Sequence, residues 1–428
     1  MSCANRLGEL PVQCAWRTGF FKGWRPVALA FSVSASGLAL AAPVDVYRGT
    51  LGGSEVVMEL GRPQADGSHA GRYFYPRYGV DIPLKGPLNA LAEAQPLTPE
   101  LTEKLGVGEP LFTDAEQRAV VWNMQQQADG SLSGEWVDGI HGKKLPLKLK
   151  RIAHYDPEAL EPKGVEAVTR AIVQGTGSGI SQDVAISEKT APYDYLRMSL
   201  QPLGQGKEVV LAPNLAWRPV RDARTQFWYP RLTRHPDANI LAQTNAVLEQ
   251  RHWAMSLDAL ACKSSIYLNL GPAAGSLGNY NDEQIKVSYL STALMSVVES
   301  GSTDCGGAHP NNHFNPFVLD LRKGGYMDFR RLFKGSKYGE NGFEYADALM
   351  KKIAKVAAKQ DAHEGEASGC TDYLAEFMVP MIETPAAVSF VVSGIGHAMG
   401  ACLGSGVTIA FKDFRPYIKP GAERYLQP

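Results

Sequence analysis

TDCGGAHPNNHFNPFVLDLRKGGYMDFRRLFK, residues 303–334, is the most structurally demanding stretch of this sequence. Its central apolar run, Phe317–Leu321, predicts a strand. A second apolar run follows and ends in Asp328–Phe333. Two such runs joined by a Gly324-Gly325 turn indicate a β-hairpin. We therefore expect this stretch to form the centre of a sheet in the second half of the chain.

The same stretch resembles the core of an extracytoplasmic bacterial family, the RsiV-like domain of unknown function. In that family a GGAHP-type loop precedes a strand and a second apolar segment. The order of the flanking segments is also similar: Tyr229-Pro230 and a helix at Ala238–Trp253 come before the loop, and Val407–Ile418 closes the domain. The family is known from the lysozyme-sensing anti-sigma factor RsiV and from neighbours of peptidoglycan deacetylase domains. The resemblance covers about the last half of the chain.

The fold class expected for this half is α+β, with an antiparallel sheet and two main helices. Asp237 is a plausible cap for the first helix, whose apolar face continues to Leu260 and which Cys262 closes. The second helix is expected over Glu344–Gln360, where apolar residues form one face and lysines the other. The remaining strands are expected at Tyr193–Leu200, Arg224–Pro230, Gln284–Glu299, Thr384–Ser393 and Gly404–Phe411.

The first half of the chain is expected to be an all-β module. Turn residues such as Gly52-Gly53 and Asp129-Gly130 separate short alternating runs. Their order predicts an antiparallel meander that closes as a small barrel or curled sheet. The predicted strands are Val44–Thr50, Glu55–Leu60, Ala70–Tyr75, Val80–Lys85, Arg118–Gln125, Gly130–Val137 and Lys143–Arg151.

The start of the chain has the pattern of an export signal. Arg17, Lys22 and Arg25 precede an apolar run, and Ala39-Leu40-Ala41 is a small-x-small cleavage pattern. We therefore expect a periplasmic or secreted protein with no membrane span in its mature chain, since no later apolar stretch is long enough for one. The expected organisation is a signal peptide at 1–41, the β module at 43–152, a linker at 153–190 and the RsiV-like domain at 191–428.

The amino-acid composition indicates a globular protein and argues against one class of partner. The chain has 428 residues, 44% of them hydrophobic, and a formal net charge of −1. That is enough apolar material for a large core. Without a basic excess or a run of Lys and Arg, nucleic acid is not an expected partner.

Four cysteines follow the predicted leader: Cys262, Cys305, Cys370 and Cys402. An even number in an exported chain indicates two disulfides. Three pairings are possible, and we predict Cys262–Cys305 and Cys370–Cys402, which link neighbours in the sequence. With all four cysteines paired, a cysteine nucleophile is not expected.

Catalytic signatures are scarce. The sequence contains no G-x-S-x-G, S-x-x-K or H-E-x-x-H. His309 and His313 have a spacing that holds a metal on a helix, but Pro310 between them favours a loop. A third ligand would come from Asp304, His363 or His397. The alternative is that His309 only forms a hydrogen bond within a tight loop.

Two further groups of residues are candidate sites. Glu364 and Glu366 are a carboxylate pair by sequence proximity, in surroundings typical of an exposed loop. Tyr73, Tyr75, Tyr78 and Trp136 would form an aromatic face for a glycan or a peptide, or else part of a core.

Function is expected to be binding without catalysis in the cell envelope, by a monomer that needs no cofactor or metal. The resemblance implies lysozyme or a peptidoglycan fragment as the ligand. The alternative is a metal-dependent cell-wall hydrolase or deacetylase accessory enzyme. The binding surface is expected near Cys305–Asn315 and the Phe317–Phe333 hairpin, where an exposed polar turn carries the binding residues Gly306, Gly307, His309, Pro310, Asn311, Asn312, His313 and Asn315.

Overall fold

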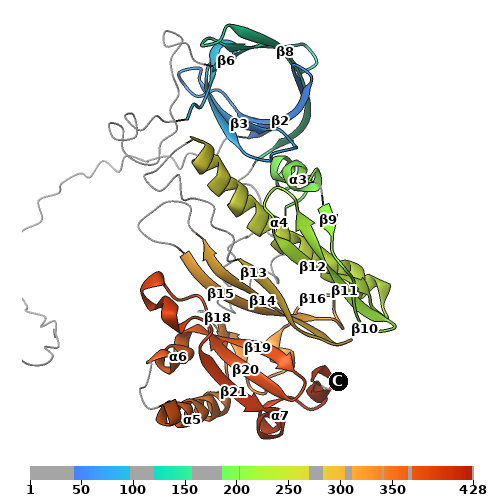
Figure 1. The fold of residues 1–428 in the computed structure, drawn as a ribbon, viewed down its shortest axis with the longest axis vertical. Coiled ribbons are helices and arrows are strands. Elements are labelled where there is room, and N and C mark those ends of the chain that lie inside the picture. Colours follow the sequence, from blue (N-terminus) through green and yellow to red (C-terminus); the bar gives the residue numbers. More distant parts are fainter. Residues whose placement is uncertain are drawn as a thin grey trace, which may run out of the picture. The chain divides into compact units, whose positions relative to one another are not determined.

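The computed structural model of the chain describes residues 43–96, 120–156, 186–201, 203–268, 283–303, 311–339, 342–364 and 369–426 (Figure 1). These residues form a closed antiparallel barrel, followed by antiparallel sheets with two main helices. The predicted α+β class is therefore confirmed. The predicted signal peptide lies outside the described residues. No helix in the described part of the chain is both long and apolar enough to cross a membrane.

The barrel has eight strands that follow one another around the wall. Each strand pairs antiparallel with the next, and β1 closes the barrel on β8 with Val44 opposite Tyr155. The short strand β5 is absent from the sequence prediction, because three residues give too little alternation to recognise. The strands are β1 (Val44–Leu51), β2 (Ser54–Gly61), β3 (His69–Phe74), β4 (Ile82–Gly86), β5 (Leu91–Glu93), β6 (Val120–Gln126), β7 (Leu132–Asp138) and β8 (Lys143–Tyr155).

Side chains fill the barrel interior. Period-two alternation turns every second residue inward, and the inward set includes Met58, Leu84, Trp122 and Leu147. The wall is tight at Gly49, where a Cβ atom would lie 2.0 Å from the carbonyl oxygen of Lys148 on β8. Only glycine allows β1 and β8 to approach this closely.

Helix α3 (Pro192–Ser199) replaces the strand predicted at Tyr193–Leu200, so that prediction is wrong. Pro192 opens the helix and Asp194 lies in its first turn, both favourable at a helix start. Tyr193 packs with Val46, Val57 and Phe74, which lie on the outer surface of the barrel wall. The predicted linker at 153–190 falls mainly outside the described residues, while residues 153–155 belong to β8.

A four-stranded sheet and a long helix follow. The strands of the sheet are β9 (Leu203–Gln205), β10 (Val209–Ala212), β11 (Leu215–Asp222) and β12 (Trp228–Arg234). Helix α4 (Ala238–Leu268) packs against β12 and continues past Cys262, where the sequence predicted its end. Asp237 accepts hydrogen bonds from the backbone N–H groups of Asn239 and Ile240, as expected for a cap.

The second sheet contains the stretch quoted first. Its strands are β13 (Gln284–Leu290), β14 (Leu294–Thr303), β15 (Asn311–Asp320) and β16 (Gly325–Tyr326). The single strand region predicted over Gln284–Glu299 is thus a hairpin of β13 and β14. The predicted turn between β15 and β16 is present, with Gly324 at a left-handed φ of 75°. Its second arm is short, since Phe329–Arg331 form a 3-10 turn.

The last part of the chain surrounds one large core. It comprises β17 (Lys337–Gly339), β18 (Gly342–Glu344), α5 (Asp347–Glu364), α6 (Leu374–Phe377), β19 (Met378–Thr384), β20 (Ala387–Val392), β21 (Gly406–Ala410) and α7 (Phe411–Phe414). The predicted Cys370–Cys402 disulfide is present, with its Cα atoms 5.1 Å apart. Cys262 is also disulfide-bonded, and its predicted partner Cys305 lies outside the described residues.

Candidate functional site

Most of the predicted binding loop, Cys305 to Pro310, lies outside the described residues. The residues after it were expected in an exposed polar turn, and this is wrong. Asn311–Asn315 belong to β15 and pair with β14 over their whole length, with His313 opposite Gly301. The backbone N–H and C=O groups that a turn would leave open are used in the sheet ladder.

His313 forms a close pair with a carboxylate. Its Nε2 atom lies 2.5 Å from Oε1 of Glu283, and 18% of the His313 side chain is exposed against 1% for Glu283. Burial raises the pKa of Glu283, while the His313 contact acts in the opposite direction. The other oxygen of Glu283, Oε2, is buried without a hydrogen-bond partner among the described residues. Asn315, by contrast, is buried and accepts a hydrogen bond from Ser393.

The expected metal ligands do not assemble in the part of the chain that is described. No group of three or more His, Cys, Asp and Glu side chains there is placed to hold a metal ion. Asp304, His309 and Glu366 lie outside the described ranges. Glu364 ends α5, and His397 begins a 3-10 turn that runs to Cys402. These positions do not test the role of either residue.

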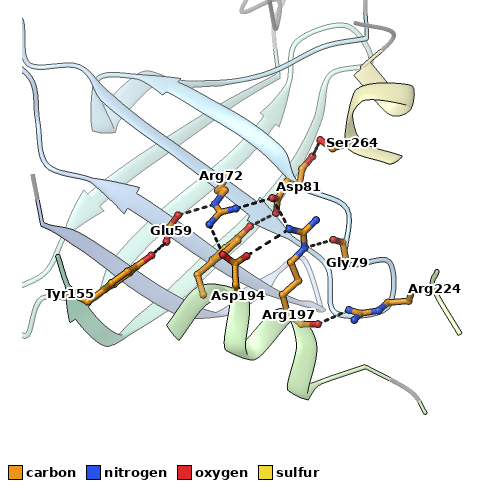
Figure 2. A network of polar contacts seen from close by, with 10 residues as sticks. Glu59, Arg72, Gly79, Asp81, Tyr155, Asp194, Arg197, Arg224 and Ser264 are labelled. Carbon is orange, nitrogen blue, oxygen red and sulfur yellow. Dashed lines mark hydrogen bonds and ion pairs between the residues drawn. The ribbon is translucent and has the colours of Figure 1, made fainter. Parts of the chain in front are cut away.

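A polar network joins the loop after β3 to α3 and α4 (Figure 2). Arg72 on β3 donates to Glu59, Asp81 and Asp194 at 2.8, 3.1 and 3.2 Å. Arg197 donates to Asp81 at 2.9 Å. Since each arginine of the network pairs with acids of the same network, we interpret it as a structural connection, although Oδ1 of Asp194 and Nη2 of Arg197 are buried without a hydrogen-bond partner among the described residues. The network holds α3 against the barrel wall.

The same loop is tied to α4. Ser264 of α4 donates to the backbone carbonyl of Asp81 at 2.5 Å. Arg197 donates to the carbonyl of Gly79 at 2.5 Å, and Leu260 of α4 lies beside the same glycine. These contacts bring the C-terminal part of α4, which ends at Leu268, to the end of the barrel where β3 and β5 finish.

A carboxylate occupies this end of the barrel. Glu93, the last residue of β5, is 6% exposed. One of its oxygens, Oε2, accepts three hydrogen bonds: 2.9 Å from Tyr73 Oη, 3.0 Å from Trp122 Nε1 and 3.0 Å from Trp136 Nε1. None of the hydrogen bonds between described residues involves the other oxygen, Oε1. Burial raises the pKa of Glu93, although the three donors act against that shift.

Aromatic rings surround this carboxylate. The rings of Tyr73 and Trp122 meet edge to face with centroids 4.7 Å apart, and Tyr75 lies 5.7 Å from Tyr73. Burial and the negative charge of Glu93 raise the pKa of Tyr75 to about 12. They also raise the pKa of Tyr267, which α4 contributes and which is 46% exposed.

We call Glu93, Tyr73, Tyr75, Trp122, Trp136 and Tyr267 the barrel-end cluster. The aromatic face predicted from the sequence forms in part: Tyr73, Tyr75 and Trp136 belong to the cluster, while Tyr78 is exposed beside Arg77. Sequence reasoning missed Glu93. Its signal was an acid two residues after the buried Leu91, which places both on the inward side of a strand.

Comparisons with known proteins give a likeness to solved structures but no match in sequence. No protein-family model matches the chain, and no curated protein matches it. Among solved structures, the chain is similar to the crystal structure of a member of the DUF3298 family from Bacteroides fragilis. The identity is 10% and the TM-score 0.30, and the alignment covers 51% of this chain and 94% of that chain. The resemblance of residues 303–334 to the RsiV-like family stays a prediction.

Proposed function

We propose that this chain is an exported, non-catalytic binding protein of the cell envelope, and that its barrel end receives a peptidoglycan fragment. The observation that carries the proposal is the barrel-end cluster: a carboxylate with one open oxygen, framed by aromatic rings. Small-ligand sites combine an apolar, aromatic lining with a few placed polar groups, and barrel mouths are a common position for them. Sugar rings and stem peptides offer the apolar faces and polar hydrogens that such a lining recognises.

Export is supported by two independent features. The first residues have the charge and apolar pattern of a signal peptide. The disulfide Cys370–Cys402 is typical of an oxidising compartment. The cell wall as the source of the ligand comes from the resemblance to the RsiV-like family, which also offers lysozyme as a protein ligand.

Calorimetric titration of the full-length chain with purified peptidoglycan fragments, and separately with lysozyme, tests the proposal. We expect fragment binding that weakens at least about tenfold in Tyr267→Ala. Trp228→Ala is the matched control, because Trp228 is another exposed aromatic residue, 42% exposed, on β12. No heat with any fragment would refute the proposal. Lysozyme binding that Tyr267→Ala leaves unchanged would move the function to another surface.

The pair of His313 and Glu283 favours a second candidate, a metal-dependent cell-wall hydrolase or deacetylase accessory enzyme. Metal-binding histidines are often oriented by a carboxylate on their other nitrogen, and Glu283 holds His313 in this way. About one zinc per chain after dialysis, lost in His313→Ala, would support this candidate. Release of acetate or sugar fragments from peptidoglycan by the same preparation would establish it over binding alone.

A further inference from the structure

We infer that the group seated against Glu93 is a positively charged amine, so that the ligand of the barrel end is an ammonium-bearing fragment. The inference rests on the proposed binding function and specifies its ligand. It is argued from the open oxygen of Glu93, from the missing counter-charge and from the rings around it.

The first argument is the uneven use of the carboxylate. A carboxylate offers about four acceptor positions, two on each oxygen. Three donors crowd onto Oε2 and none of the described residues donates to Oε1. Oε1 is not one of the buried atoms without a partner in the described part of the chain, so it is accessible from outside. A ligand that donates to Oε1 would use an acceptor that the protein leaves open.

The second argument is charge. Five acids are buried as whole residues in the described part of the chain, and the four other than Glu93 each pair with an arginine. The buried side chain of Glu283 pairs with His313. None of the ion pairs between described residues includes Glu93. The nearby charge of Asp138 has the same sign and raises the pKa of Glu93 further. The paired acids are Asp222 with Arg224, Glu299 with Arg251, Asp320 with Arg331 and Asp328 with Arg330.

The third argument is the rings. Aromatic faces attract cations through their quadrupole, most strongly where water is excluded. Trp136 and Tyr75 are only partly buried and pack against the barrel core beside the carboxylate. A carboxylate among aromatic rings is complementary to an ammonium group in charge, in hydrogen-bond donors and in ring contacts together. A sugar hydroxyl would supply a donor but leave the negative charge uncompensated.

The geometry also separates amines from guanidinium groups. A guanidinium recognises a carboxylate by two parallel bonds to both oxygens. Because Oε2 already accepts three protein donors, that fork has no second acceptor here. An ammonium group needs only the open oxygen Oε1. Peptidoglycan offers such an amine in two places: a de-acetylated amino sugar, and the side-chain amine of the diamino acid in the stem peptide.

Matched ligands distinguish these sources. The full-length chain is titrated with a muropeptide carrying a free side-chain amine and with the same muropeptide N-acetylated. It is also titrated with a glucosamine disaccharide and with its fully N-acetylated form. We expect one free-amine ligand to bind at least about tenfold more tightly than its acetylated partner. The pair that shows the difference identifies the source of the amine.

The matched variant is Glu93→Gln. Its amide oxygen keeps an acceptor for Tyr73, Trp122 and Trp136, while the negative charge is lost. Glu135→Gln on β7 is the control, since Glu135 is exposed and pairs with Lys144 outside the cluster. We expect Glu93→Gln to remove the preference for the free amine and Glu135→Gln to keep it.

A pH series on the unaltered chain provides a test that needs no variant. The titratable groups facing Glu93 are Tyr73, Tyr75, Tyr267 and Asp138. The pKa values of the tyrosines are raised and that of Asp138 is lowered, so these groups keep their charge state below neutrality. Amine affinity should therefore fall as acid protonates Glu93. His141 pairs with Asp138, and a His141→Gln variant is the control for any contribution of that pair to the pH series.

The possible results distinguish failure of the ammonium inference from failure of the proposed fragment binding. Equal affinity for free and acetylated ligands, or a preference that survives Glu93→Gln, would overturn the ammonium inference and leave fragment binding standing. No binding of any fragment would overturn both.

Discussion

A buried ion pair of Arg251 joins helix α4 to the sheet that contains β14, and its removal is a direct test of what stabilises the second half of the chain. Arg251 on α4 and Glu299 on β14 form a bidentate pair, with Nε–Oε1 at 2.8 Å and Nη2–Oε2 at 2.6 Å. Both side chains are 2% exposed. Tyr326 accepts a further bond from Arg251 at 2.8 Å, and the guanidinium lies 3.8 Å from the ring centroid of Phe317. The pair thus ties the long helix to the central sheet.

We predict that Arg251→Met destabilises the chain by about 4 kcal/mol. Removing one partner of a buried ion pair leaves an uncompensated charge, which costs about 3–5 kcal/mol. Methionine keeps part of the packing against Phe317. Tyr229 still donates to Glu299, since burial and that carboxylate raise the pKa of Tyr229 and keep its proton in place.

The double variant, Arg251→Met with Glu299→Gln, measures the cost of leaving the Glu299 carboxylate without its partner. Because the glutamine amide carries no charge, we expect the double variant to recover about 2 kcal/mol of the lost unfolding free energy. Unfolding free energies come from urea titrations followed by tryptophan fluorescence and far-UV circular dichroism. A loss below about 1 kcal/mol in the single variant, or a double variant less stable than the single one, would contradict the argument.

Three further predictions concern other parts of the fold. Glu93→Leu leaves two buried donors and the partly buried Trp136 without an acceptor and should cost about 3 kcal/mol or more, while Glu93→Gln should cost under about 1 kcal/mol, as chemical denaturation will show. Burial lowers the pKa of His252 to about 3, so the unfolding free energy should decrease as pH falls from about 6.5 towards 3, and His252→Phe should flatten that decrease. Replacing Cys370 and Cys402 by serine opens a link across 32 residues and should cost about 4 kcal/mol; an unchanged melting temperature would count against it.

The strands of the barrel could be predicted, but not the closure of the barrel. Alternation such as Leu145, Leu147 and Leu149 shows which residues face inward, because side chains on a strand point to opposite sides in turn. Closure requires β1 to pair with β8, with Val44 opposite Tyr155. No local pattern specifies a partner so distant in the sequence.

At Tyr193–Leu200 the sequence pattern predicted a strand, but the structure has helix α3. The run contains apolar residues at spacings compatible with a strand or a short helix, and periodicity over so few residues does not decide between them. The helix places Tyr193 and Arg197 on one face, one turn apart. That face meets Phe74 and the carboxylate of Asp81, so packing on the barrel selects the helix.

The sequence by itself determined the α+β class, the alternation inside the barrel wall and the cap of α4, because each depends on residues that are close together in the sequence. It also indicated the disulfide Cys370–Cys402, because the number of cysteines after the leader is even. Only the tertiary structure placed Glu93 beside its three donors. Trp122 and Trp136 lie opposite each other on the neighbouring strands β6 and β7, while Tyr73 comes from β3, which is not a neighbour of either strand. Bringing Tyr73 to the same carboxylate depends on the curvature of the whole barrel wall, and that curvature leaves no local trace in the sequence.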